Sequence, residues 1–81
     1  MTIRLDQLGV GESATVRVLQ NQGAIRNRLR DIGLIEGTVV ACIGRSPCGD
    51  PSAYRIRGSV FAIRASDASK IGVEKERTED N

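Results

Sequence analysis

Two cysteines are the side chains in this sequence best suited to covalent or metal chemistry, because its 81 residues include no histidine. Histidine is the commonest general base and the commonest metal ligand, and without it no Ser-His or Cys-His arrangement can form within the chain. Cys42 and Cys48 stand six positions apart, which is neither a C-x-x-C redox motif nor half of a two-pair zinc site. Neither a G-x-x-x-x-G-K-S/T phosphate loop nor a G-x-G-x-x-G fingerprint occurs. We therefore predict that the protein is not an enzyme and has no catalytic residues.

The cysteine pair is also a weak metal site. Two soft thiolates, helped by a carboxylate such as Asp50, could bind a transition metal, but they leave half of a tetrahedral site empty. We therefore predict no metal ligands, no ferrous iron site and no bound cofactor. Cys42 falls in an apolar run and is most simply a small core residue, whereas Cys48 falls in a loop. A disulfide between them is not expected in a reducing cytosol.

The length of the chain allows one compact domain, since 81 residues fall below the usual domain size of ~100–150. Only Tyr54 and Phe61 are aromatic, so the core must come from aliphatic residues. No apolar run approaches the ~18 residues needed to cross a membrane. The first residues also lack the apolar stretch of a signal peptide. We expect a cytoplasmic protein without direct membrane insertion.

Charge is distributed unevenly along the chain. Residues 74–81 carry four acids, two bases and no apolar residue. We interpret them as a charged, disordered tail behind a single domain over residues 1–73. The rest of the chain is basic and mostly uses arginine, which suits an acidic protein, nucleic acid or an anionic membrane surface. The alternative is that these charges are simply solvated.

A change in the period of apolar residues predicts a strand followed by a helix. Residues 13–18 alternate, with Ala14, Val16 and Val18 on one face, as in a half-buried strand. Residues 24–32 carry apolar side chains one helical turn apart, which predicts a short amphipathic helix. Its inner face carries Ile25, Leu29 and Ile32, and its outer face carries Arg26 and Arg30. Gly33 follows where a helix C-terminus favours a left-handed residue.

Three further strands are predicted after the helix. Residues 38–43 are apolar or β-branched at nearly every position, which predicts a strand buried on much of both faces. Residues 53–57 and 60–64 alternate and predict a hairpin that turns at Gly58-Ser59. Phe61 and Ile63 would then face Tyr54 and Ile56.

The end of the domain is predicted to be a helical turn that begins after Ser66 as N-cap and runs to Ile71. The chain is therefore mainly β, with one short helix after the first long strand. Four or five short strands cannot safely leave open edges, so a small, strongly bent barrel with the helix at one end is the economical arrangement.

Three segments, in order, resemble the FeoA family, ferrous iron transport protein A. Residues 28–38 resemble its helix-to-strand signature, R-x-L-x-x-L-G-L-x-x-G, and residues 45–51 resemble a loop that commonly ends in L-G-D-P. Residues 56–58, 61–64 and 67–68 match the closing hairpin and terminal turn. The resemblance covers about residues 5–72. The sequence departs from the pattern at Glu36, Cys48 and Ser52, where proline, leucine and an apolar residue are common.

The resemblance implies a Src-homology-3-like small β-barrel with a cytosolic accessory role in ferrous iron uptake. It also implies a protein partner, the membrane GTPase-permease FeoB, which would hold the chain at the inner face of the membrane. The sequence leaves self-association into a homo-oligomer open.

Candidate partner-binding residues fall into three groups. Arg26 and Arg30 form a basic helix face. The loop from Pro47 to Pro51 is either turn punctuation or a rigid recognition loop, and it comprises Pro47, Cys48, Gly49, Asp50 and Pro51. Leu29 is most simply a core contact. The rival interpretation is that Leu29, Leu34 and Ile35 line an apolar docking groove between helix and barrel.

Two other functions remain as alternatives. One is a free-standing regulatory barrel related to the C-terminal domain of iron-dependent repressors, although the chain has no residues to spare for the winged helix that precedes that barrel. The other is a small RNA-binding barrel that uses the exposed arginines. Single-strand binders interleave exposed aromatic residues with basic ones. Since both aromatic residues are expected inside, nucleic acid is not the expected partner.

Overall fold

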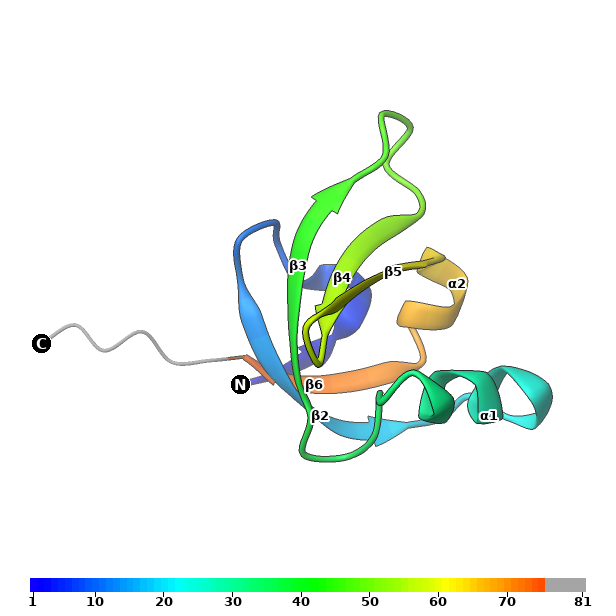
Figure 1. Ribbon diagram of the computed structural model, residues 1–81. Coiled ribbons are helices and arrows are strands. Elements are labelled where there is room, and N and C mark those ends of the chain that lie inside the picture. The colour runs from blue at the N-terminus through cyan, green and yellow to red at the C-terminus, as the bar shows by residue number, and fades with distance from the viewer. Residues whose placement is uncertain (76–81) are drawn as a thin grey trace, which may run out of the picture.

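The computed structural model describes residues 1–75, which form one six-stranded antiparallel sheet with short helical segments at its margins (Figure 1). The strands are β1 (Thr2–Arg4), β2 (Ser13–Leu19), β3 (Val39–Arg45), β4 (Ser52–Ile56), β5 (Ser59–Ile63) and β6 (Ile71–Lys75). They lie in the order β1-β6-β2-β3-β4-β5. The helical segments are η1 (Leu5–Gln7), α1 (Gly23–Asp31) and α2 (Ala65–Ala68).

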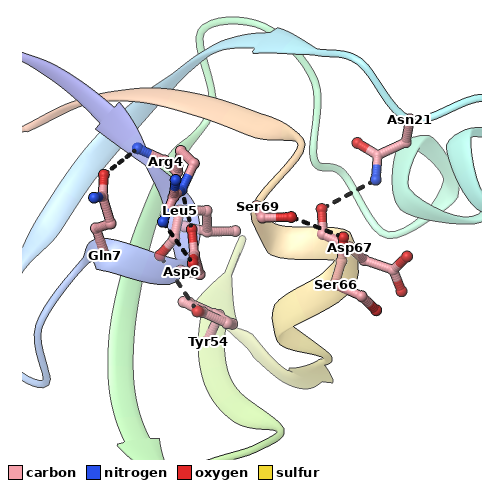
Figure 2. Close-up of polar contacts among 9 residues, drawn as sticks. All are labelled: Arg4, Leu5, Asp6, Gln7, Asn21, Tyr54, Ser66, Asp67 and Ser69. Carbon is pink, nitrogen blue, oxygen red and sulfur yellow. Dashed lines mark hydrogen bonds and ion pairs between the residues drawn. The ribbon is translucent and has the colours of Figure 1, made fainter.

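The sheet bends strongly around a single aliphatic core (Figure 1). Its register shifts between Val16 and Val18 in β2 and between Cys42 and Gly44 in β3. Such bulges increase local twist and bend a strand. The bend brings β4 over η1, where the Tyr54 hydroxyl donates to the carbonyl oxygen of Leu5 at 3.4 Å (Figure 2). Burial raises the pKa of Tyr54, so its hydroxyl keeps the proton that it donates.

Val18 was predicted to face the core, but the bulge in β2 turns it outward. Ala14 and Val16 are buried as predicted, but the side chain of Val18 is 46% exposed. One inserted residue shifts the alternation by one position, so every later side chain on the strand changes face. Leu19 consequently takes the half-buried position.

The central strand β3 is buried on one face only, which contradicts the prediction of two buried faces. Val40 and Cys42 belong to the core, whereas Val39 is 54% and Ile43 37% exposed. The reason is tertiary, because α1 lies beyond the margin of the sheet and does not cover its outer face (Figure 1). An apolar run is therefore not enough to establish that a strand is covered on both sides.

The β4–β5 hairpin is present, but its turn lies one residue earlier than predicted. Arg57 and Gly58 form the turn with φ of 53° and 82°, as a two-residue type I′ turn requires. Tyr54 pairs with Phe61 as expected, whereas Ile63 pairs with Ser52 instead of Ile56. The prediction placed glycine first in the turn, but here arginine adopts the left-handed conformation.

The C-terminal segment differs most from the prediction. α2 begins after Arg64, not after Ser66, and Ile71 starts a strand instead of ending a helical turn. This strand, β6, lies between β1 and β2. The predicted domain boundary after residue 73 therefore falls inside β6. Residues 76–81 of the predicted tail lie outside the described residues.

Charged residues on β6 secure the sheet. Lys75 Nζ lies 2.8 Å from Glu12 Oε2, and Glu12 Oε1 accepts the backbone N–H of Gly9 at 2.7 Å. The hydrogen bond from Lys75, followed by that from Gly9, lowers the pKa of Glu12 below its ordinary value of 4.5. On the other side of β6, Glu74 pairs with the amino terminus at 2.6 Å.

Replacing Glu12 by glutamine should lower the melting temperature at neutral pH and have no effect in strong acid. A carboxylate with a lowered pKa stabilises the folded state above its ordinary pKa of 4.5, and this contribution disappears as the pH falls through the lowered value. Thermal melts of both proteins over a pH series measure the difference. Asp31→Asn is the control, since Asp31 forms no ion pair within residues 1–75. A difference that persists undiminished at the lowest pH would contradict the ion-pair explanation.

Candidate docking surfaces

α1 is attached to the sheet by a narrow apolar seam. It projects from the margin of the molecule (Figure 1), and Leu29 is its only buried residue, with 6% of its surface exposed. Ile25 and Ile32 are half-buried against the core. Leu34, just beyond the helix, is fully buried. Leu29 is thus the main apolar anchor of the helix, and the flanks of α1 remain accessible.

Arg26 fixes the beginning of α1 to the end of β2. Its guanidinium donates to the carbonyl oxygen of Leu19 at 2.7 Å and to that of Asn21 at 3.4 Å. Arg26 is exposed as expected, but its guanidinium is also tied to the backbone, and its role in partner binding stays a prediction. The side chain of Arg30 forms no hydrogen bond or ion pair within residues 1–75. Sequence spacing places both arginines outside, but only the structure reveals the carbonyl groups that Arg26 binds.

Asn21 connects the start of α1 to α2, a role that the sequence did not reveal. The side chain is 2% exposed, and its Nδ2 donates to the carbonyl oxygen of Asp67 at 3.1 Å (Figure 2). The two residues are far apart in the sequence. The sequence could not reveal this bond, because the burial of Asn21, which makes a polar partner necessary, depends on the tertiary structure.

The candidate loop from Pro47 to Pro51 is exposed and closed by hydrogen bonds. Ser46 N–H donates to the carbonyl oxygen of Pro51 at 3.1 Å, and Gly49 N–H donates to that of Ser46 at 2.8 Å. Asp50 Oδ1 accepts the N–H of Ala65 at 2.8 Å and so holds the loop against the beginning of α2. The structural role of Asp50 is therefore established, while partner recognition by the loop stays a prediction.

The two cysteines lie in different environments. Cys42 is fully buried in β3, and Cys48 is exposed in the loop. Within residues 1–75, no three side chains of histidine, cysteine, aspartate or glutamate come together where they could hold a metal ion.

The arginines divide into anchored and free groups. Arg45 donates to the carbonyl oxygen of Leu8 at 2.6 Å and to Ser52 Oγ at 2.8 Å. Arg57 lies over Gly33, close enough that a Cβ added to Gly33 would stand 2.7 Å from Arg57 Cδ. Other outer arginines have side chains without a hydrogen bond or ion pair in the described part of the chain; they include Arg28, Arg30, Arg55 and Arg64.

Two grooves flank α1. The β2 groove, of about 570 Å³, lies between α1 and β2 and is lined by Arg17, Val18, Leu19, Arg26, Arg30, Leu34, Ile35 and Glu36. The β5 groove, of about 360 Å³, lies between α1 and β5 and is lined by Ile25, Arg28, Leu29, Ile32, residues 60–64 and Asp67. Leu29 and the pair Leu34 and Ile35 therefore line different grooves, and not the one groove of the rival interpretation; partner binding by these residues stays a prediction. The helix separates Leu29 from the other two.

Comparison with known proteins identifies the family. Residues 3–75 match the FeoA domain. The chain belongs to the FeoA family. The FeoA protein of Chlorobium tepidum superposes with a TM-score of 0.89 at 28% identity, over 96% of this chain and 74% of that one. A zinc-complexed FeoA protein of Stenotrophomonas maltophilia, described as a prokaryotic SH3 domain protein, gives 0.80 at 30% identity, over 93% and 96% of the chains.

FeoA membership confirms the SH3-like fold expected from the sequence, although within residues 1–75 the sheet keeps two open edges and does not close into the predicted barrel. It also places the chain in a family associated with ferrous iron transport. A related protein of Porphyromonas gingivalis is a fusion of Fe(2+) transport protein A with the Fe(2+) transporter FeoB, 32% identical over 72 residues. The match covers 89% of this chain and only 8% of the fusion protein. Among residues 1–75, no helix is long and apolar enough to span a bilayer.

Replacing Leu29 by alanine should lower the free energy of unfolding by roughly 2–5 kcal/mol, because it leaves a cavity where α1 meets the core. Chemical denaturation measures the loss. Ile35→Ala is the matched control, since Ile35 lies close to α1 but is 40% exposed, and it should cost much less. Equal stability of the Leu29 variant and the wild type would show that Leu29 is not the anchor of the helix.

Replacing Gly33 by alanine should destabilise the fold more than replacing Gly37. Both glycines have left-handed φ, 98° and 93°, so alanine costs roughly 1–2 kcal/mol at either position. Only at Gly33 would the new Cβ also meet Arg57, because nothing lies within 4 Å at Gly37. Repeating both substitutions in an Arg57→Ala background should remove the difference. If the extra cost survives without Arg57, the contact is not its cause.

Proposed function

We propose that this FeoA chain is a non-enzymatic, cytoplasmic accessory protein of ferrous iron uptake. It docks on the cytosolic part of a FeoB-type GTPase-permease and modulates transport. The observation that carries the proposal is the P. gingivalis relative, in which a segment similar to this chain and FeoB belong to one polypeptide. Fusion keeps two parts at a high effective concentration, which is useful when the parts bind one another.

The surface of the chain supports a docking role. Arg28, Arg30, Arg55 and Arg64 are exposed, and none has an ion-pair partner within residues 1–75. Exposed apolar side chains accompany them, including Val39 on β3 and Val60 on β5. Free positive charge steers an acidic partner into contact, while apolar contacts slow its release.

Modulation of transport requires more than binding. A docked protein shifts a conformational equilibrium only if it binds one state of its partner more tightly than another. We therefore expect the chain to have different affinities for the nucleotide states of the permease's GTPase domain. By reciprocity, the docked chain would change the nucleotide affinities of that domain by the same factor.

The purified chain should bind the isolated cytosolic part of a FeoB-type permease, with an association rate that falls as salt concentration rises. Its dissociation rate should change little, since screening acts mainly on the approach of charged surfaces. Surface plasmon resonance at low and high salt measures both rates. An unrelated acidic protein of similar net charge on the sensor is the control. Absence of binding at low salt, or equal binding to the control, would overturn the proposed function.

A further inference from the structure

We propose that the open edge of β5, with the β5 groove beside it, receives an extended acidic segment of the protein partner as an additional strand. The inference deepens the proposed function and rests on it, because it assigns the docking site and the chemistry of the partner segment.

The hairpin turn determines which backbone groups of β5 are free. In a two-residue hairpin, the pair that flanks the turn is hydrogen-bonded, and here that pair is Ile56 and Ser59. Hydrogen bonding then alternates, so Phe61 bonds to β4, whereas Val60 and Ala62 direct their N–H and C=O groups away from it. No strand within residues 1–75 pairs with that side of β5. These groups form a ready template for another strand.

The two edge strands, β1 and β5, differ in how well they are protected against pairing with another strand. β1 has three residues, and ion pairs stand at both of its ends, from the amino terminus to Glu74 and from Arg4 to Asp6. β5 has five residues, S-V-F-A-I, with neither a charge nor a proline among them, and Val60 is 53% exposed. Soluble proteins usually protect such an edge against unwanted pairing. An unprotected β5 edge beside a groove fits a surface that has a specific strand to bind.

The β5 groove supplies apolar contacts next to this edge. Ile25 of α1, Ile32 at the C-terminal end of that helix and Phe61 of β5 line it and are only half-buried. A strand added at the edge would project alternate side chains toward them. The groove is therefore suited to an extended segment with apolar residues at every second position.

The charged residues that line the β5 groove indicate that the bound segment is acidic. Arg28 and Arg64 line the β5 groove and have no ion-pair partner in the described part of the chain, while Asp67 is the only acid that lines it. An acidic segment would satisfy the excess positive charge. A second copy of this chain, paired through its own β5, would instead add two more arginines. The groove thus favours an acidic partner over self-association.

The test measures binding to the cytosolic part of the permease by two variants. Ala62→Pro removes one outward N–H and leaves the bonds to β4 in place, as proline permits on the free side of an edge strand. Arg28→Glu reverses one groove charge on the exposed side of α1. Each variant should weaken affinity by about tenfold or more. In the wild-type complex, the amide protons of Val60 and Ala62 should become protected from hydrogen exchange.

Matched controls separate the site from general effects. Thr2→Pro likewise removes an outward N–H from the β1 edge, because Met1 bonds to Lys75 in β6 and the Thr2 N–H points outward. It also removes the hydrogen bond from Thr2 Oγ1 to Glu74 Oε1, so its folding must be checked. Lys70→Glu makes the same charge change at an exposed residue outside the β5 groove. Both should bind within about threefold of the wild type. Melting temperatures check folding, and Arg28→Glu decides the matter if the proline variant is unstable.

Each other outcome overturns the inference. Wild-type binding that both β5 variants retain would overturn the β5 site and leave the proposed function standing. Absence of wild-type binding would overturn the proposed function and the β5 site together. Protection of Val60 and Ala62 that rises with the concentration of the chain alone would show that a second copy occupies the edge.

Discussion

A sheet of six short strands with only short helical segments beside it has too little material to cover both of its faces. It can bury apolar surface only by bending until its inner face closes on itself. The bulges after Val16 and Cys42 permit that bend, and Tyr54 reaches across it to Leu5. The core, the exposed outer face of β3 and the position of α1 beyond the sheet margin all depend on this one constraint.

The same shortage of material explains the two roles of arginine. Where strands end without a covering helix, backbone carbonyl groups lack partners, and a guanidinium group has five donors with which to satisfy them. Arg26 binds such a carbonyl group at the end of β2, and Arg45 binds that of Leu8 just beyond η1. Within residues 1–75 the side chains of Arg28 and Arg64 have no such contact, so they can attract a partner. Arginine count alone therefore overstates the basic surface available for docking, and a substitution at Arg26 changes structure as well as charge.

The position of α1 beyond the sheet margin leaves surface open to a partner. Because the helix is anchored chiefly by Leu29, it leaves grooves along both flanks instead of sealing the sheet. A helix that covered the sheet would remove the exposed edge of β5 from reach. The fold thus combines a bent sheet with an accessible strand edge, which suits the proposed docking role.

Local pattern determined much of this protein. The spacing of Ile25, Leu29 and Ile32 specified the helix, alternation at Tyr54 and Ile56 specified the inner face of β4, and three short motifs indicated the family. These signals act between neighbours in the sequence. The exposure of the Pro47–Pro51 loop also followed from its composition, but the bond from Ala65 to Asp50 did not.

Tertiary structure decided what depends on residues far apart in the chain. The β2 bulge turned Val18 outward, the uncovered outer face exposed Val39, and the pairing of β6 between β1 and β2 moved Glu74 into the sheet. The division of the predicted groove by α1 is of the same kind. In each case the burial of a side chain depends on which distant element lies against it, and sequence periodicity contains no information about that element.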